Sequence, residues 1–200
     1  MPPEQNSQPL RVLAFSGSPR RGGNTDTLLD CAVAGAASCG AQVKHIILSD
    51  LEIYPCQHCD GCIQTGGICV VEDDMQQVHH DLRACDRFIL SAPVFFMGIP
   101  AQAKAMIDRC QALWVIRYLM KLPIGLQPGA LRKGAFISAG SSMYNNLFLG
   151  SVATVKSWYI SCDIEYSYEL LLPGIKDFDA VKNNPEVLDT AFKLGQDLAG

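Results

Sequence analysis

Short apolar runs alternate along this chain with longer segments in which apolar residues recur every three or four positions. Three such runs occupy residues 10–15, 87–91 and 134–138, residues 42–48 contain Val43, Ile46 and Ile47, and residues 163–172 alternate apolar with polar positions. Runs of this kind predict strands. The segments between them are long enough to hold helices. The sequence therefore predicts a doubly wound α/β fold with a five-stranded parallel sheet between two helical layers.

Helical spacing follows each predicted strand. After the first one, apolar residues recur from Leu28 to Ala36 at intervals that place them on one helix face. Asp73 and Asp74 form an N-cap signal, and Pro100 and Pro185 suit the first turn of a helix. The further helices are predicted over residues 73–85, 100–114, 147–159 and 185–198.

Composition supports one compact domain. Hydrophobic residues make up 48% of the 200 positions and charged residues 18%, which favours a single domain over residues 10–200. Residues 1–9 are polar and Pro-rich and are predicted to be a disordered tail. A net charge of −4 argues against nucleic acid as a partner. No secretory signal and no run of membrane-spanning length is present, so we expect a cytoplasmic enzyme without a membrane partner.

The loop after the first strand is rich in hydrogen-bond donors. It reads Ser-Gly-Ser-Pro-Arg-Arg-Gly-Gly-Asn-Thr over residues 16–25 and leads directly into a helix. A strand, a small-residue loop and a helix N-terminus together collect backbone N–H groups around an anion. The loop has neither the Lys of a triphosphate P-loop nor the glycine spacing of a dinucleotide fingerprint. It predicts a site for one terminal phosphate, the alternative being an ordinary turn.

Two further loops follow strands that would end at the same sheet edge. The loop over residues 92–99 is apolar and aromatic where an exposed loop should be polar, which suits a flat ring or, alternatively, a protein interface. The loop that begins Ala139-Gly140-Ser141 offers free backbone N–H groups. Ligands of doubly wound sheets bind at this edge, so the three loops predict a flat ring with a phosphate tail.

These motifs together resemble the flavodoxin-like NAD(P)H-dependent FMN reductases. The resemblance rests on residues 16–25, on Ser-Ala-Pro-Val-Phe-Phe at 91–96 and on the segment 101–109, and it covers nearly the whole chain. It implies a flavodoxin-like fold, noncovalent FMN and NAD(P)H as co-substrate. By the family pattern, the phosphate would be held by Ser16, Ser18, Pro19, Arg20, Asn24 and Thr25. The ring would be lined by Pro93, Val94, Phe95, Phe96, Met97 and Gly98, with Ala139, Gly140 and Ser141 at its other edge.

Four of the nine cysteines lie within fourteen residues, in the connection over residues 49–73. The arrangement of Cys56, Cys59, Cys62 and Cys69 is similar to the compact motif of iron–sulfur flavoproteins. The spacing C-x2-C-x2-C can hold one face of a [4Fe–4S] cluster, which a fourth cysteine completes. Zinc sites more often use two separated C-x2-C pairs. A disulfide framework is not expected in a cytoplasmic protein, and the motif also occurs without iron.

The resulting prediction is an FMN-dependent NAD(P)H oxidoreductase that passes electrons to a small molecule or a protein, through the cluster where one is bound. Hydride transfer to flavin needs no acid or base from the protein, so no catalytic side chain is assigned. Two alternatives stay open, an electron carrier and a metal-stapled interaction module. The apolar run 114–120 predicts a homodimer or homotetramer.

Overall fold

The computed structural model describes residues 9–126, 129 and 131–200, so most of the predicted tail lies outside the described residues. Its centre is a parallel five-stranded sheet with the order β2-β1-β3-β4-β5. The strands are β1 (Arg11–Ser16), β2 (Gln42–Ile47), β3 (Arg87–Pro93), β4 (Lys133–Ala139) and β5 (Glu165–Leu172). The five predicted strands and their parallel arrangement are confirmed. This is the flavodoxin-like topology.

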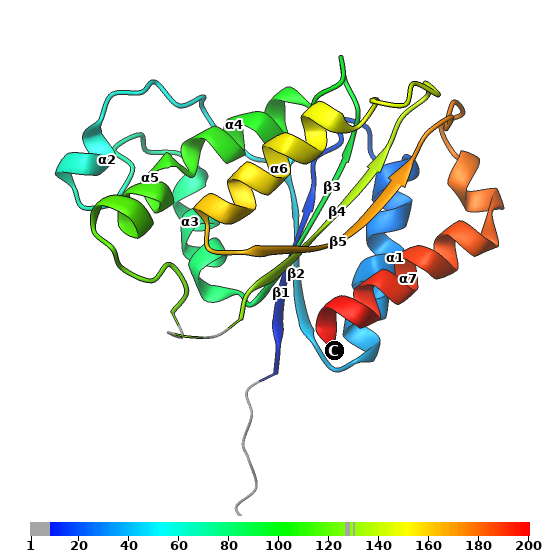
Figure 1. The fold of residues 1–200 in the computed structure, drawn as a ribbon, viewed down its shortest axis with the longest axis horizontal. Helices are drawn as coiled ribbons and strands as arrows, with labels where there is room; N and C mark the ends of the chain where they lie inside the picture. The colour runs from blue at the N-terminus through cyan, green and yellow to red at the C-terminus, as the bar shows by residue number, and fades with distance from the viewer. Residues whose placement is uncertain (1–8, 127–128, 130) are drawn as a thin grey trace, which may run out of the picture.

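Helices cover both faces of the sheet (Figure 1). One layer holds α1 (Asn24–Ser38) and α7 (Pro185–Ala199). The other layer contains α3 (Met75–Ala84), α4 (Ala101–Arg109) and α6 (Leu149–Ser161). Shorter helical turns are η1 (Leu48–Asp50), α2 (Gly61–Gln64), α5 (Gln111–Trp114), η2 (Val115–Leu119) and η3 (Ala180–Asn183). The predicted three-layer α/β/α architecture is therefore confirmed.

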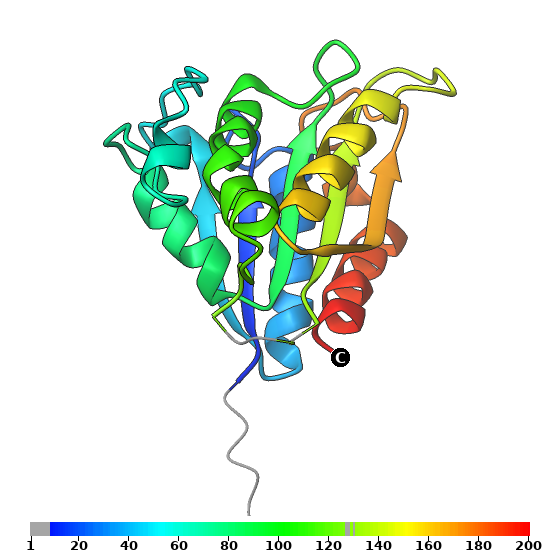
Figure 2. The same ribbon diagram turned by 60° about the vertical axis from the view of Figure 1, so that its left-hand side comes forward.

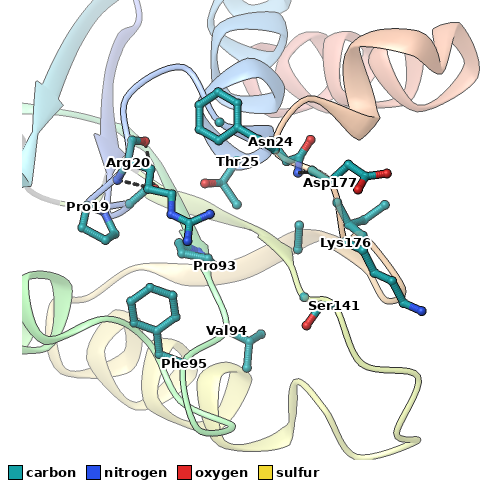
Figure 3. Close-up of a pocket in the computed structure, with 16 residues that line it drawn as sticks. Pro19, Arg20, Asn24, Thr25, Pro93, Val94, Phe95, Ser141, Lys176 and Asp177 are labelled. Atoms are coloured by element: carbon teal, nitrogen blue, oxygen red, sulfur yellow. Dashed lines mark hydrogen bonds between the residues drawn. The ribbon is translucent and has the colours of Figure 1, made fainter.

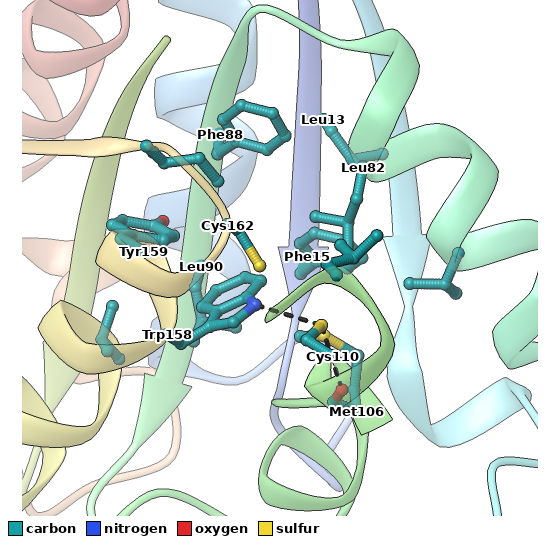
Figure 4. Packing of buried hydrophobic residues seen from close by; sticks show 14 of the residues in the cluster. Leu13, Phe15, Leu82, Phe88, Leu90, Met106, Cys110, Trp158, Tyr159 and Cys162 are labelled. Atoms are coloured by element: carbon teal, nitrogen blue, oxygen red, sulfur yellow. Dashed lines mark hydrogen bonds between the residues drawn. The ribbon is translucent and has the colours of Figure 1, made fainter. Parts of the chain in front are cut away.

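The three central strands β1, β3 and β4 are buried on both faces because each face packs against helices, whereas the edge strands β2 and β5 are more exposed. In β1, Leu13 and Phe15 point to the layer of α3, α4 and α6, whereas Val12 and Ala14 point to α1 and α7. The core on the first face contains large side chains, among them Phe88 of β3 and Trp158 of α6 (Figure 4). The buried cluster on the second face consists of aliphatic residues, among them Ala14 and Ala135, and it includes residues of α1 and α7.

Two glycines allow α1 and α7 to approach closely. A Cβ built on Gly35 would lie 2.0 Å from the carbonyl oxygen of Phe192, and one on Gly195 would lie 1.9 Å from that of Ala32. Either distance is too short for a real contact, so only glycine fits at this helix crossing. The contact fixes where the N-terminus of α1 stands relative to the sheet.

The helix predicted over residues 100–114 is interrupted. α4 ends at Arg109, a new turn begins at Gln111, and the chain continues as a π-helix from Val115 to Leu119. Within the run that suggested self-association, Val115 and Ile116 are buried in the core. Three residues remain exposed, namely Tyr118, Leu119 and Met120. The self-association prediction now rests on these residues.

The carboxyl ends of all five strands lie at one edge of the sheet, with the connecting loops above them (Figure 2). The loop after β3 projects furthest, and the segment between β2 and α3 lies to one side of it. Register pairs Ser16 with Ser91 and Pro93 with Ala139 at this edge. Among the described helices, none is long and apolar enough to cross a membrane.

Candidate functional site

A cavity of about 290 Å³ opens at the carboxyl edge of the sheet, between the loops after β1, β3, β4 and β5 (Figure 3). Its volume is close to the lower end of the usual range for small-molecule sites, ~300–1,000 Å³. Eleven of the fifteen residues predicted to bind the cofactor line it. They are Ser18, Pro19, Arg20, Asn24, Thr25, Pro93, Val94, Phe95, Ala139, Gly140 and Ser141.

One end of this cavity is formed by the N-terminus of α1. The first N–H groups of a helix have no partner within the helix and point toward a ligand. A tight turn precedes them, in which the Ser18 hydroxyl donates to the carbonyl of Arg20 and accepts from its N–H, both at 3.0 Å. The Arg20 guanidinium points into the cavity (Figure 3). This end is suited to a phosphate.

Ser16 does not line the cavity. It is 1% exposed, and its hydroxyl donates to the Asp26 carboxylate, which also accepts from the N–H of Gly22 at 2.9 Å. Asp26 thus ties the end of β1 and the middle of the loop to the first turn of α1. Ser16 therefore lies beneath the loop, and its hydroxyl is engaged by Asp26 and does not face the cavity where a phosphate was predicted.

Asn24 lines the cavity, but its side-chain amide is already engaged. Nδ2 donates to the carbonyl of Asp177 at 2.7 Å, and Oδ1 accepts from the N–H of Val181 at 3.0 Å. Asn24 therefore fastens the segment after β5 to the start of α1. Its own backbone N–H, at the first turn of the helix, is the group that it can offer an anion.

The apolar loop divides into a wall and a tip. Pro93, Val94 and Phe95 line the cavity, whereas Phe96, Met97 and Gly98 do not. Phe95 and Gly98 exchange two backbone hydrogen bonds of 2.9 Å. This closes a two-residue hairpin in which Phe96 and Met97 have φ of 49° and 62°. Bulky residues are strained in the left-handed region, and the Phe96 side chain is fully exposed.

The far side of the cavity includes a segment that the sequence did not indicate. Ile175, Lys176, Asp177 and Phe178 follow β5 and line the cavity together with Gly23. The Ile175 N–H donates to the carbonyl of Gly140 at 3.0 Å, which joins this segment to the loop after β4. The available signal was the sheet rule itself, because the end of the fifth strand lies at the same edge.

The four clustered cysteines line a second, smaller cavity of about 20 Å³. They come from an extended segment and from α2, and three of them are partly buried while Cys59 is exposed. Burial and the neighbouring thiol of Cys69 raise the pKa of Cys62. All four predicted ligands thus face one space, next to Arg109 and the turn that begins α5.

This set does not resemble a site for a single ion. In the described part of the chain, no three His, Cys, Asp or Glu side chains stand close enough together to hold one metal ion. A [4Fe–4S] cluster requires a different ligand geometry, because each iron binds one cysteine and the four cysteine sulfurs need not converge on one point. Four thiols beside a buried cation fit such a cluster chemically, and the loop would have to widen around it.

Arg109 and Asp73 form a buried pair at the base of this cysteine cavity. Both side chains are 1% exposed, and Nη1 and Nη2 donate to the two carboxylate oxygens at 2.5 and 3.0 Å. Burial alone would raise the pKa of Asp73, but hydrogen bonds from Arg109 and from the N–H groups of Tyr54 and Met75 outweigh it and lower that pKa. The pair therefore stays charged.

His79 secures the end of α4 from the neighbouring helix α3. The carbonyl of Arg109 can only accept, so the Nε2–H of His79 donates to it, at 2.9 Å. Burial lowers the pKa of His79 to about 4. At neutral pH the ring is uncharged and serves as a structural donor.

A parallel doubly wound sheet of this order, with a cavity between the first helix and an apolar wall at its carboxyl edge, defines a flavodoxin-like protein. The chain matches the family described as NADPH-dependent FMN reductase over residues 10–148. It is 32% identical over 195 residues to an iron–sulfur flavoprotein of Methanocaldococcus jannaschii, a match that covers 95% of this chain and 96% of that protein. This protein therefore belongs to the NADPH-dependent FMN reductase family, a family of flavin-dependent oxidoreductases.

Other similar proteins agree with this assignment. An iron–sulfur flavoprotein of Methanosarcina thermophila is 33% identical over 127 residues, which cover 62% of this chain and 66% of that protein. Among solved structures, the NAD(P)H:quinone oxidoreductase from Methanothermobacter marburgensis superposes with a TM-score of 0.70 at 15% identity, over 96% of this chain and 100% of that one. A flavodoxin from the domain Archaea superposes with a TM-score of 0.56 at 11% identity, over 95% and 96%. These structures support the fold.

Proposed function

We propose that this protein oxidises NAD(P)H with an FMN bound in the cavity at the carboxyl edge of the sheet. The observation that carries this proposal is the meeting of three features in one cavity, namely the α1 N-terminus, the Arg20 guanidinium and the apolar wall of Pro93, Val94 and Phe95. When bound, FMN would accept a hydride from NAD(P)H and release electrons to an acceptor.

The residues of the protein bind the FMN and orient its ring. The helix N-terminus and Arg20 hold the phosphate, and the loops after β3 and β4 fix the ring by packing and backbone hydrogen bonds. Lys176 and Phe178, on the segment fastened by Asn24, would cover the remaining side. No described side chain is required to move a proton, so the nicotinamide needs only a free face of the ring.

The proposal that Arg20 binds the FMN phosphate can be tested by comparing it with the adjacent Arg21. Arg20→Ala combined with Thr25→Val should weaken FMN binding by several kcal/mol, because charge-assisted hydrogen bonds contribute about 1.5–3 kcal/mol each. Arg21 forms an ion pair with Asp50 and does not line the cavity, so Arg21→Ala is the matched control. A fluorescence titration that finds equal FMN affinity in both variants would disprove the assignment.

We further propose that Cys56, Cys59, Cys62 and Cys69 hold a [4Fe–4S] cluster through which electrons leave singly. Support comes from the shared cavity of the four thiols and from relatives named iron–sulfur flavoproteins. The helix α4 begins after the apolar loop and ends at Arg109 beside the cysteines, so it joins the two sites. A quinone, a free flavin or a redox protein of the cytoplasm would be the acceptor.

Cysteine replacement separates the two cofactors. Cys59→Ser should remove iron and abolish reduction of a one-electron acceptor, while FMN binding and NAD(P)H oxidation with a two-electron acceptor persist. The exposed Cys39 lies outside the cavity, so Cys39→Ser is the control. If anaerobically prepared wild type contains no iron or acid-labile sulfide, the cluster is disproved and the FMN reductase stands. If it shows no NAD(P)H oxidation with any acceptor, the electron-carrier alternative is favoured.

A further inference from the structure

One buried hydrogen-bond donor beside the cysteines has no partner among the described residues. Arg109 donates through Nη1 to the carbonyl of Tyr54 at 2.9 Å and through Nη2 to that of Val71 at 3.0 Å, in addition to its two bonds with Asp73. Its Nε is buried and makes no hydrogen bond to any described residue. A buried unpaired donor on a charged group is costly, so its presence points to a missing acceptor.

The position of Arg109 identifies the chemistry of that acceptor. Arg109 lines the cavity of the four cysteines and is the sole arginine among its described lining residues. Cys69 lines the same cavity, and its backbone carbonyl already accepts a hydrogen bond from the Gln76 side-chain amide at 2.8 Å. Four of the eleven residues that line this cavity are cysteines, so sulfur is the acceptor that the cavity offers most.

The remaining contacts of Arg109 hold this donor in a fixed direction. Tyr54 lies before the first cysteine, and Val71 and Asp73 lie after the last one. By binding all three, the guanidinium closes the base of the cysteine loop, and the bidentate pairing with Asp73 fixes the plane of the group. A rigid arginine of this kind would keep Nε aimed at the same point whether or not the loop widens.

We infer that Arg109 is a positioning residue of the proposed cluster, whose Nε–H donates to Cys69 sulfur or to an adjacent cluster sulfide. This inference rests on the proposed [4Fe–4S] site and adds a function to it. A hydrogen bond to a cluster sulfur stabilises the more negative, reduced state and so raises the reduction potential. Asp73 balances the guanidinium charge, which leaves the directed N–H bond as the main influence of the pair.

The first test compares two buried arginines. Arg109→Lys keeps a positive charge but removes Nε–H, and we expect its cluster midpoint potential to shift to more negative values while that of FMN stays unchanged. Arg132 is also buried and donates to the carbonyls of Cys85 and Cys162, away from the cysteine loop, so Arg132→Lys is the matched control and should shift neither potential. Equal cluster potentials in wild type and Arg109→Lys would overturn the inference.

The second test uses the unaltered protein and needs no variant to fold. Wild type labelled with ¹⁵N at arginine is reduced anaerobically and studied by pulsed EPR. We expect a ¹⁵N coupling to the reduced cluster, since one arginine nitrogen would lie a single hydrogen bond from sulfur. Absence of this coupling overturns the inference. This test remains decisive even if the Arg109→Lys variant fails to bind iron and the first test cannot be performed. Wild type that binds no iron at all would overturn the cluster itself, while iron without the coupling would overturn only the function of Arg109.

Discussion

The side-chain Nδ2 of Asn24 donates to the carbonyl oxygen of Asp177 at 2.7 Å, although 153 positions separate the two residues. The first turn of α1 thereby holds the segment that follows β5. That segment supplies four residues to the cavity wall, so one asparagine links the anion end of the cavity to its opposite side. The wall of the cavity therefore includes a contact far from the loop after β1.

Asn24→Ala should therefore weaken FMN binding without removing any side chain needed for the phosphate. Loss of the two hydrogen bonds to Asp177 and Val181 should cost about 1–2 kcal/mol, a rise in Kd of roughly 5- to 30-fold. The exposed Asn183 in η3 provides the control variant Asn183→Ala. Titration of each apoprotein with FMN measures the effect. Equal affinity in the two variants would show that the segment does not help to bind the flavin.

We expect Phe96 and Met97, at the tip of the hairpin after β3, to strengthen FMN binding and to lower the free energy of unfolding. Type I′ turns prefer Asn-Gly, and this chain places Phe96 and Met97 in left-handed conformations instead. Phe96→Asn with Met97→Gly should raise the free energy of unfolding by about 1–3 kcal/mol and weaken FMN binding. Denaturant titration and fluorescence would measure the two effects, with Tyr118→Ala as a control for loss of an exposed aromatic ring. Unchanged FMN affinity would remove both residues from the predicted site.

Acidification should destabilise the protein through His79. The pKa of His79 is about 4 in the folded state, against 6.5 for an unperturbed histidine in the unfolded chain. The unfolded chain therefore takes up the proton first as pH falls. Stability is unaffected above pH 6.5, falls between pH 6.5 and 4, and loses about 3 kcal/mol in total below that range.

His79→Gln keeps a donor for the Arg109 carbonyl but cannot be protonated. Its free energy of unfolding should fall less than that of wild type between pH 6.5 and 4, as measured by urea unfolding at a series of pH values. The neighbouring His80 is exposed, and His80→Gln should follow the wild-type curve. Parallel curves for wild type and His79→Gln would contradict the assignment of this loss to His79.

The close crossing of α1 and α7 should not tolerate a methyl group. Gly195→Ala would bring a Cβ to 1.9 Å from the Ala32 carbonyl, so the helices must separate and the free energy of unfolding should drop by about 1–3 kcal/mol. Gly200→Ala, where the new Cβ meets only an ordinary contact of 3.5 Å, should have little effect. Thermal unfolding of the two variants measures the difference. A Gly195→Ala protein as stable as wild type would mean that the helices can move apart freely.

Much of the fold was predictable because each strand carries its own pattern. The first strand is apolar at every position from Val12 to Phe15, which is what burial on both faces requires. The break at Cys110 was not predictable, because apolar spacing continues from Met106 through Trp114 and nothing local ends the helix. The short helix α2 was also missed. It follows Asp60, whose left-handed backbone (φ 57°) has no sequence signal as strong as glycine.

The candidate site was predictable where a loop follows a strand directly. Ser18, Arg20 and Phe95 line the cavity as expected. Ser16 was assigned to the phosphate because hydroxyls are good donors, but only the folded chain shows that Asp26 engages it. Lys176 was missed since its segment reaches the cavity through contacts with Asn24 and Gly140, which are distant in sequence.

The length of helix α4 sets the distance between the proposed FMN site and the proposed cluster site. The helix starts at Ala101 and ends at Arg109, and nine residues at about 1.5 Å each give it a length of roughly 13 Å. Loops on either side can gain or lose residues with little effect on this spacing. One residue inserted into the helix would lengthen it by about 1.5 Å and rotate its far end by about 100°. Arg109 would then face away from the cysteines, so in this fold the length of one helix sets both how far apart the two sites stand and how they face each other.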